Sequence, residues 1–359
     1  MQEALYSSFY QADLEYIRQF KAIDWERLQG KRIVLSGATG QIGSCLVDAL
    51  MQKNLTENFN CRVICLTRNI EKARMRFFKW LDCALDFEPA DVTSPCDSFW
   101  QLQADYVLHL ASNTHPIAYA SDPIGTIKTN IVGTDNLLKL ATLNAGARFL
   151  LASSNEIYGE NRGDTDLFDE TYCGDIDCNT LRAGYPESKR CSEALVQAYR
   201  AKYGLCSVIA RLTRTYGPTL RPDDSKALTQ FIKNAVNGED IVLKSAGNQY
   251  YSYTYVADAV TGLLTVLTKG EDGEAYNIAE PGFDVRLAEV AEMVAKIGGS
   301  SVRIEKAGSL ESRGFSKVTT CRLDNKKIVS LGWKASYPLE KGLLNTIRTM
   351  RDYAQDRFE

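Results

Sequence analysis

The chain has 359 residues, of which 45% are hydrophobic, and its formal net charge is −3. This size and composition predict one large domain, or two domains in intimate contact, around a sizeable buried core. Because basic and acidic residues are interspersed, the charge favours neither nucleic acid nor an anionic membrane as a partner, and a small ligand must be held by local groups.

The first residues, MQEALYSSFYQADLEY, carry acids and no apolar run, so we expect neither a signal peptide nor a membrane anchor there. No other stretch is apolar over a length that would span a bilayer. The ten cysteines are scattered without the spacing of a zinc knuckle, which predicts reduced thiols in a cytoplasmic protein. With only two histidines in the chain, we expect no metal site.

Residues 1–30 are expected to form an N-terminal helical extension that packs on the main body. Its apolar residues recur at helical spacing and are Leu14, Ile17, Phe20 and Ile23, followed by Trp25 and Leu28.

The segment RIVLSGATGQIGSCLVDAL (32–50) predicts an apolar strand, a glycine-rich turn and a helix with one apolar face. Further apolar runs at 61–67, 105–112 and 147–154 predict short strands of a parallel sheet that is covered on both faces. Helical segments lie between these strands. We therefore expect residues 31–212 to form an α/β Rossmann core, a doubly wound parallel sheet that binds a dinucleotide.

After about residue 213 the pattern loosens into a loop, a helix near 228–236 and a tyrosine-dense run, NQYYSYTYVAD. We expect residues 213–359 to form mainly a smaller, discontinuous α/β substrate-binding region, with some elements returning to the core.

A GxxGxxG pattern, formed by Gly37, Gly40 and Gly43, lies directly between the first predicted strand and the first predicted core helix. Positions without side chains let the backbone approach a pyrophosphate, whose charge the helix N-terminus stabilises. The pattern predicts dinucleotide binding, and the alternative is a tight strand-to-helix turn. The loop residues expected to contact the cofactor are Gly37, Thr39, Gly40, Gln41, Ile42 and Gly43.

The end of the second predicted strand reads LTRN and has no carboxylate. In dinucleotide-binding folds an acid here usually binds the ribose, whereas an arginine pairs with a 2′-phosphate. Thr67, Arg68 and Asn69 therefore favour NADP over NAD. The alternative is that Arg68 is a solvated surface charge and that NAD binds through other contacts.

A tyrosine and a lysine lie four residues apart in YPESK, at Tyr185 and Lys189. Pro186 suits the first turn of a helix, which places the lysine one turn along on the same face. An ammonium near the phenol, together with an oxidised nicotinamide, would favour the phenolate and make it an acid–base group. The residues expected to pack this helix are Cys191, Ala194, Leu195 and Ala198.

The same spacing occurs again in YPLEK, at Tyr337 and Lys341, so spacing alone does not identify the catalytic pair. Tyr185 differs because it follows a predicted strand that ends in Ser153 and Ser154. Ligands of such folds bind where these strands end.

Several motifs in order, GATGQIG, DYVLHLAS, SSNEIYG, YPESK, RLTRTYGP and YTYVAD, make the chain resemble the extended short-chain dehydrogenase/reductase family of NAD-dependent epimerases and dehydratases. The resemblance covers about residues 31–345. It implies that Ser154 hydrogen-bonds the substrate, that Tyr185 is the acid–base residue and that Lys189 holds the nicotinamide ribose. Further cofactor contacts implied by the family are Asp91, Val92, Leu110, Ala111, Ser112 and Asn130.

In motif detail the chain is most similar to UDP-glucuronate decarboxylases, which implies that Glu156 acts near the sugar ring. Its alternative is a solvated loop acid. Asn155 replaces an acid that dehydratases of this family carry, and an amide cannot donate a proton as a carboxylic acid does, which disfavours dehydration. The resemblance implies Asn113, Ser154, Asn155 and Glu156 as substrate contacts.

The chain departs from the decarboxylase pattern in two places. Tyr251 stands where the family usually has an arginine, and Arg214 stands where it usually has an asparagine, so we expect positive charge to have moved from one wall of the site to the other. Arg182 could also meet an anionic substrate, or it could form a surface salt bridge.

The resulting prediction is an enzyme that transfers hydride on a nucleotide sugar with NAD or NADP, by epimerase, dehydratase or decarboxylase-type chemistry. One alternative is an NADPH-dependent reductase of a nucleotide-activated keto sugar, and a more remote one is a non-catalytic NADP-binding regulator. The resemblance also implies a homodimer, formed through the helix that carries Tyr185 and its neighbour.

Overall fold

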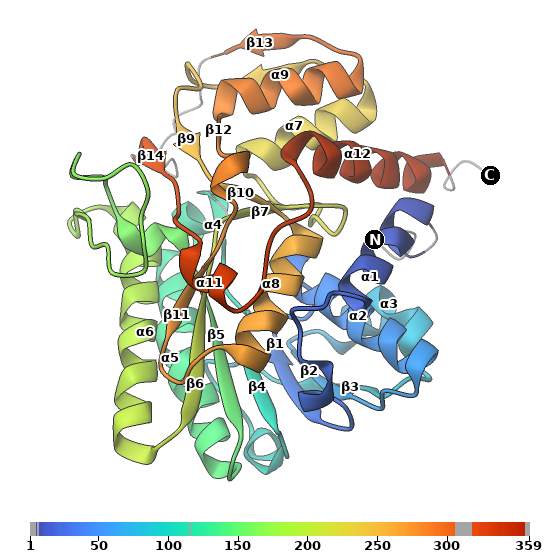
Figure 1. Cartoon of the computed structure of the whole chain (residues 1–359), viewed down its shortest axis with the longest axis vertical. Coiled ribbons are helices and arrows are strands. Elements are labelled where there is room, and N and C mark those ends of the chain that lie inside the picture. Colours follow the sequence, from blue (N-terminus) through green and yellow to red (C-terminus); the bar gives the residue numbers. More distant parts are fainter. Residues whose placement is uncertain (1–4, 6, 115, 306–317, 356–359) are drawn as a thin grey trace.

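The computed structural model describes residues 5, 7–114, 116–305 and 318–355. Its centre is a seven-stranded, all-parallel sheet in the order β11-β6-β5-β4-β1-β2-β3 (Figure 1). The strands are β1 (Arg32–Ser36), β2 (Arg62–Thr67), β3 (Leu85–Pro89), β4 (Tyr106–His109), β5 (Arg148–Ser154), β6 (Cys206–Leu212) and β11 (Ala275–Ile278). The prediction of a doubly wound Rossmann sheet is confirmed.

Helices cover both faces of this sheet because each strand buries side chains on both sides. On β1, Ile33 and Leu35 join one hydrophobic cluster, whereas Val34 joins the other. The first cluster includes residues of α1 (Ser8–Arg18), α2 (Gln41–Glu57) and α8 (Val256–Lys269), and the second includes residues of α5 (Pro123–Leu143) and α6 (Gly184–Tyr203). A short helix, α3 (Ile70–Arg76), packs beside β3.

A smaller group of elements lies over one end of the sheet (Figure 1). Its helices are α7 (Ala227–Asn237), α9 (Leu287–Gly298) and α12 (Leu339–Gln355), which pack on one another. Its strands form three small sheets, and they are β7 (Arg214–Tyr216) with β10 (Tyr253–Tyr255), β8 (Ile241–Leu243) with β13 (Val302–Ile304), and β9 (Tyr250–Tyr251) between β12 (Val285–Arg286) and β14 (Thr320–Cys321). The remaining α-helices in the described ranges are α4 (Pro116–Ser121) and α11 (Lys326–Ser330).

Short 3-10 helices connect several of these elements. They span Trp25–Arg27, Phe78–Trp80, Asp97–Gln101, Asn155–Tyr158, Leu181–Ala183 and Pro281–Phe283. None of the helices in the described ranges combines the length and the apolar character needed to cross a membrane.

The helix α6 buries a different face from the one expected. Its buried residues are Tyr185, Pro186, Ser188, Lys189, Ser192 and Val196. Cys191, Ala194 and Ala198 are exposed, and only Leu195 of the expected set packs against the core. The prediction of an apolar stripe was wrong because small polar serines, hydrogen-bonded to backbone carbonyls and to Asn130, fill the narrow contact with α5.

The N-terminal helix α1 is held by buried hydrogen bonds as well as by apolar packing. The Tyr10 hydroxyl donates to Asp48 of α2 at 2.7 Å, and the Tyr16 hydroxyl donates to Asp258 of α8 at 2.7 Å. Asp13, which is 0% exposed, accepts a hydrogen bond from the Tyr255 hydroxyl. The extension is thus tied to both α2 and α8.

These contacts predict a pH-dependent effect of Asp13→Asn. Burial raises the pKa of the Asp13 carboxyl to about 6, against hydrogen bonds from Tyr255, Tyr337 and Asn345 that lower it. A carboxyl whose pKa is higher in the folded than in the unfolded protein favours the folded state while it is protonated, at a pH below its unfolded pKa. This contribution to stability is lost as the pH rises through the folded pKa of about 6. We expect the advantage of the uncharged variant over wild type to be larger at about pH 7.5 than at about pH 4.5, by on the order of 2 kcal/mol.

Urea unfolding at the two pH values measures this difference. Asp82→Asn is the matched control because Asp82 is exposed, and it should change stability equally at both. An Asp13→Asn protein destabilised by the same amount at both pH values would contradict the prediction.

Candidate active site

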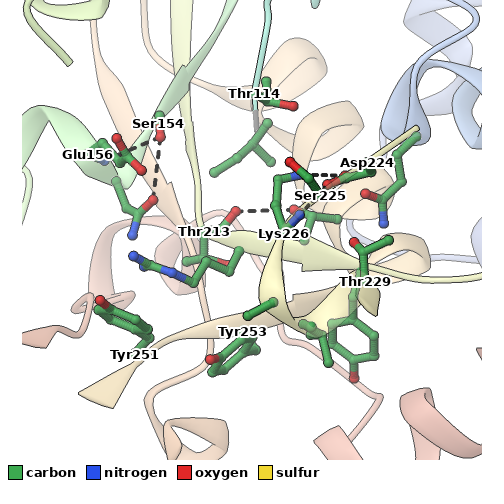
Figure 2. Close-up of a pocket in the computed structure, with 18 of the residues that line it drawn as sticks. Thr114, Ser154, Glu156, Thr213, Asp224, Ser225, Lys226, Thr229, Tyr251 and Tyr253 are labelled. Atoms are coloured by element: carbon green, nitrogen blue, oxygen red, sulfur yellow. Dashed lines mark hydrogen bonds and ion pairs between the residues drawn. The ribbon is translucent and has the colours of Figure 1, made fainter. Parts of the chain in front are cut away.

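One cavity of about 410 Å³ lies where the strands of the large sheet end at their carboxyl side. The loops after β1 and β4 flank it, and the strand order reverses between these two strands, which is where ligands bind in such sheets. Its lining also includes α7 and the small strands, so it runs from the sheet into the smaller group of elements. In Figure 2, Ser154, Glu156 and Tyr251 lie on one side, and Asp224, Lys226 and Thr229 lie on the other.

The glycine loop is compact enough that side chains would not fit. Gly37 has φ +77°, and a Cβ there would lie 2.6 Å from the backbone nitrogen of Ala111. A Cβ on Gly43 would lie 2.2 Å from the carbonyl oxygen of Gly37. No side chain in the described part of the chain caps the N-terminus of α2, and the buried Nε2 of Gln41 has no hydrogen-bond partner there. Free backbone donors at a helix N-terminus suit a pyrophosphate.

Most of the expected site residues line this cavity together. They are Gly37, Gly40, Gln41, Ile42, Gly43, Leu110, Ser112, Ser154, Asn155, Glu156, Arg182, Tyr185, Lys189, Arg214 and Tyr251. The expected residues outside the lining are Thr39, Thr67, Arg68, Asn69, Asp91, Val92, Ala111, Asn113 and Asn130.

Some of the residues outside the lining support those within it. Ser112 donates from its hydroxyl to Asn130 Oδ1 at 2.7 Å, and Asn130 Nδ2 donates to Ser188 at 2.8 Å. Asn113 Nδ2 donates to Thr126 at 3.1 Å. Asn130 therefore links the loop after β4 to the helix that carries Tyr185.

At the end of β2, Thr67 is half-buried and Arg68 is exposed. Asn69 is engaged as the N-cap of α3, since its side chain accepts a hydrogen bond from the backbone of Lys72 at 2.8 Å. The pKa of the Asp91 carboxyl is lowered overall, because burial raises it but hydrogen bonds from Thr93 and, to a smaller extent, the charge of Arg68 lower it.

Ser154 and Tyr185 meet at the cavity from β5 and α6. Burial, and next the Glu156 carboxylate, raise the pKa of Tyr185, whereas a hydrogen bond from Ser154 and the charge of Arg182 lower it. Ser154 in turn holds the start of the following turn, because its hydroxyl oxygen accepts from the backbone of Glu156 at 3.3 Å (Figure 2).

Lys189 is 2% exposed and donates from Nζ to the Ala152 carbonyl at 2.8 Å. Burial lowers the pKa of this lysine to about 8, against an opposing charge on Glu193. In the protein alone, the charged groups that act on Tyr185 are thus Glu156 and Arg182. The expected lowering of the tyrosine pKa is absent because burial, together with Glu156, outweighs the opposite effects of Ser154 and Arg182. A bound nicotinamide would add the positive charge that this expectation also required.

Arg182 forms an ion pair with Glu156 inside the cavity, and not the surface salt bridge that was the alternative. Its Nη2 donates to both carboxylate oxygens, and its guanidinium lies 4.4 Å from the ring centroid of Tyr119. The Tyr119 ring is in turn 5.0 Å from the ring of Tyr185. Both members of the ion pair keep less than a fifth of their side chains exposed, at 16% and 18%. The pair, the ring of Tyr119 and Tyr185 therefore form one packed group.

Arg214 and Tyr251 touch each other. The guanidinium carbon of Arg214 lies 3.3 Å from the centroid of the Tyr251 ring. The expectation that charge had moved to the opposite wall was wrong, because the backbones of β7 and β9 bring both positions to one wall of the cavity.

The second tyrosine–lysine pair has a different environment. The ring of Tyr337 packs against Tyr16 and Tyr255, and its backbone N–H donates to Asp258 at 2.9 Å. Lys341 lies 4.5 Å from the Tyr337 ring centroid. The pair lies outside the cavity lining and packs the C-terminal segment onto α8.

Sequence reasoning missed further residues that line the cavity. They are Tyr119, Thr213, Asp224, Lys226, Leu228, Thr229, Lys244, Gln249 and Tyr253. The amphipathic pattern of α7 and the tyrosine-dense run were visible in the sequence, but neither shows which side chains face the sheet.

Three comparisons with known proteins agree with this geometry. The family model described as "NAD dependent epimerase/dehydratase family" matches residues 33–279. UDP-glucuronic acid decarboxylase 5 of Arabidopsis thaliana is 33% identical over 313 residues, covering 87% of this chain and 87% of that protein. UDP-glucuronic acid decarboxylase 1 of Xenopus tropicalis is 31% identical over 327 residues, covering 89% of this chain and 72% of that protein.

Solved structures show the same fold. A dTDP-glucose 4,6-dehydratase from Streptomyces venezuelae with NAD bound has a TM-score of 0.76 at 25% identity, covering 91% of this chain and 98% of that one. A UDP-glucuronic acid 4-epimerase from Bacillus cereus, in complex with UDP-glucuronic acid and NAD, has a TM-score of 0.75 at 22% identity, covering 90% and 99%.

Proposed function

Because this chain belongs to the NAD dependent epimerase/dehydratase family, we propose that it is an enzyme that uses NAD or NADP to modify a nucleotide sugar, with decarboxylase-type chemistry as the first reaction to test. The observation that carries this proposal is one cavity that brings Ser154, Tyr185 and Lys189 beside the glycine loop. The identity to decarboxylases over most of the chain supports the reaction class.

The residues around the glycine loop fit a dinucleotide. The loop has no room for side chains, the N-terminus of α2 is open, and Gln41 carries a buried donor without a partner among the described residues. We assign the pyrophosphate to Gly37, Gly40 and Gly43. Further cofactor contacts are assigned to Thr39, Gln41, Ile42, Asp91, Val92, Leu110, Ala111, Ser112, Asn130 and Lys189.

In this proposal residues 31–212 bind the dinucleotide, residues 213–359 mainly bind the substrate, and residues 1–30 are a packing extension. Two elements that follow residue 212 belong to the core: β11 is a strand of the large sheet, and α8 packs against that sheet.

When bound, the cofactor accepts a hydride from the sugar and can return it. The chain's own residues move the accompanying proton and hold the sugar. Tyr185 exchanges a proton with the sugar hydroxyl that is oxidised, and Ser154 hydrogen-bonds the same oxygen. Asn113, Asn155 and Glu156 are assigned to the sugar ring, and Asn155, as an amide, cannot supply the acid that dehydration needs.

The test begins with the nucleotide that purified protein releases on denaturation. Wild type is then incubated with UDP-glucuronate, and the products are followed by NMR, alongside NADH and NADPH consumption with UDP-, dTDP- and CDP-sugars. A pentose nucleotide formed without net cofactor consumption supports the proposal. No turnover of any nucleotide sugar would overturn it and favour the non-catalytic NADP-binding regulator.

A second candidate, an NADPH-dependent reductase of a nucleotide-activated keto sugar, is favoured by the exposed Arg68 at the end of β2. A guanidinium there can pair with a 2′-phosphate. Bound NAD without net consumption of either reduced cofactor would reject this candidate.

The preference for NADP is tested by Arg68→Ala. We expect the KM for NADP or NADPH to rise roughly tenfold and that for the 2′-hydroxyl cofactor to stay unchanged, because only the phosphate loses a charged partner. Steady-state kinetics with both cofactors measures the difference. Arg62→Ala is the control, since Arg62 lies at the other end of β2 and pairs with Asp86 at 2.6 Å. Equal changes for both cofactors would contradict the preference.

The proposal includes a cytoplasmic homodimer. Exposed apolar side chains on α5 support an interface there, notably Ile124 and Leu143, which are 67% and 65% exposed. The exposed Ala194 and Ala198 of the adjoining α6 would let two such helix pairs approach closely. Light scattering at micromolar concentration tests the dimer, and a monomeric mass would reject it.

A further inference from the structure

Two arginines and one carboxylate face the same side of the cavity. Arg182 is paired with Glu156, which accounts for that carboxylate. No described carboxylate forms an ion pair with Arg214, and its buried Nη1 has no hydrogen-bond partner in the described part of the structure. Among the described side chains on this side of the cavity, two guanidinium groups and one carboxylate leave one positive charge in excess.

The groups that act on the charge of Arg214 are the phenols of Tyr251 and Tyr253, the thiol of Cys321 and the Glu156 carboxylate, which is already paired with Arg182. Burial raises the pKa of Tyr251 and Tyr253, so both phenols stay neutral. Burial also raises the pKa of Cys321 to about 11, although Arg214 itself lowers it, so this thiol is neutral near pH 7. Arg214 is half-buried, with its Nη1 fully buried, and a guanidinium partly kept from water without an ion-pair partner is unfavourable. An incoming anion would relieve that cost.

Tyr251 holds the guanidinium in place. The ring lies 3.3 Å from the guanidinium carbon, and its hydroxyl donates to the Val318 carbonyl at 2.6 Å. Tyr251 belongs to β9, which is paired on both sides by β12 and β14. The ring is thus a fixed platform, and a guanidinium stacked on it keeps its N–H groups available at its edge.

We propose that Arg214, positioned by Tyr251, binds an anionic oxygen group of the substrate, either a sugar carboxylate or an oxygen of the nucleotide diphosphate. This inference rests on the proposed function. It specifies that the substrate is a nucleotide sugar whose anionic oxygen group pairs with Arg214. Arg214 is the specificity-determining residue, and Tyr251 acts through it as a positioning residue.

The experiment measures binding of UDP-glucuronate and UDP-glucose by calorimetry to the whole protein. For Arg214→Asn we expect the Kd for UDP-glucuronate to rise at least about tenfold, as for the loss of a charge-assisted pair. A loss confined to UDP-glucuronate assigns Arg214 to the carboxylate, and an equal loss for UDP-glucose assigns it to the diphosphate.

Variants of Tyr251 test whether its ring positions the Arg214 guanidinium for binding. Tyr251→Phe keeps the ring and should bind within about threefold of wild type, whereas Tyr251→Leu should lose about as much affinity as Arg214→Asn. The double variant Arg214→Asn/Tyr251→Leu should be no weaker than either single variant. Full additivity of the two losses would overturn the positioning role.

The controls separate this inference from the proposed function. Arg303→Asn removes an arginine that is paired with Asp240 outside the cavity and should bind as wild type does. Thermal unfolding should show Arg214→Asn at least as stable as wild type, because it removes an unpaired cation. Arg214→Lys is a second variant that keeps the charge without the planar stack and should bind with intermediate affinity.

Two failures are distinguishable. Wild type that binds no nucleotide sugar would overturn the proposed function and this inference together. Wild type that binds UDP-glucuronate and UDP-glucose, with Arg214→Asn within twofold of it for both, would overturn this inference alone.

Discussion

Tyr185→Phe is expected to lower turnover of the nucleotide sugar by about 10²–10⁴-fold, the usual effect of losing a positioned acid–base group. The ring and its contact with Tyr119 remain, and only the hydroxyl that would exchange a proton with the sugar is lost. Because substrate binding does not depend on that proton transfer, the loss should appear in kcat and leave KM within about threefold. Single-turnover kinetics on the whole protein measures it.

The chain supplies its own control for this experiment. Tyr337→Phe changes the other tyrosine of the same spacing, which packs against Tyr16 and Tyr255 outside the cavity. We expect it to alter thermal stability and to leave kcat unchanged. Equal turnover of Tyr185→Phe and wild type on every nucleotide sugar would remove Tyr185 from the mechanism.

Arg182→Met is expected to reduce turnover at neutral pH on the order of a hundredfold, because it leaves the Glu156 carboxylate unpaired in a mostly buried position beside Tyr185. It should also move the pH profile. Arg182 lowers the pKa of Tyr185 and Glu156 raises it, so removing the arginine shifts the tyrosine-dependent limb to higher pH.

Glu156→Gln should shift that limb the opposite way. The carboxylate that raises the pKa of Tyr185 is gone, and Arg182, released from its partner, lowers it further. Profiles of kcat against pH for the two variants and wild type show the directions. Shifts of both variants in the same direction, or no shift in either, would show that the ion pair does not tune Tyr185.

The excess positive charge near Arg214 bears on the choice between reactions. A decarboxylase must hold a sugar carboxylate, and Tyr251 stands where the family usually has an arginine that could do so. The contact between Arg214 and Tyr251 supplies a cation at the same wall. The departure from the family pattern is therefore compatible with an acidic sugar, and the binding experiment on Arg214 decides between the carboxylate and the diphosphate.

The N-terminal extension shows how a motif residue can have a packing role. Asp258 of the YTYVAD motif accepts hydrogen bonds from the Tyr16 hydroxyl and from the backbone of Ser336 and Tyr337. It joins the N-terminal helix and the C-terminal segment to α8. The sequence placed this aspartate in a family motif but carried no sign of its partners.

The sequence by itself predicted the strands β1, β2, β4 and β5 with helices between them, and the glycine loop, because the alternation of apolar runs is written along the chain. The choice of Ser154, Tyr185 and Lys189 rested on the order of the motifs and on the family resemblance as well as on the length of one helical turn. The buried face of α6 was the exception, because serines fill its contact with α5 and apolar periodicity does not detect them.

Only the tertiary structure decided which charges meet. Glu156 and Arg182 are 26 residues apart and come from two different turns, and Arg214 and Tyr251 come from strands of separate small sheets. Their contacts depend on how distant segments pack around the cavity, and packing between segments leaves no periodic signal in the sequence. For this reason the sequence could name the charged residues of the site, but it could not show that one arginine is neutralised and the other is not.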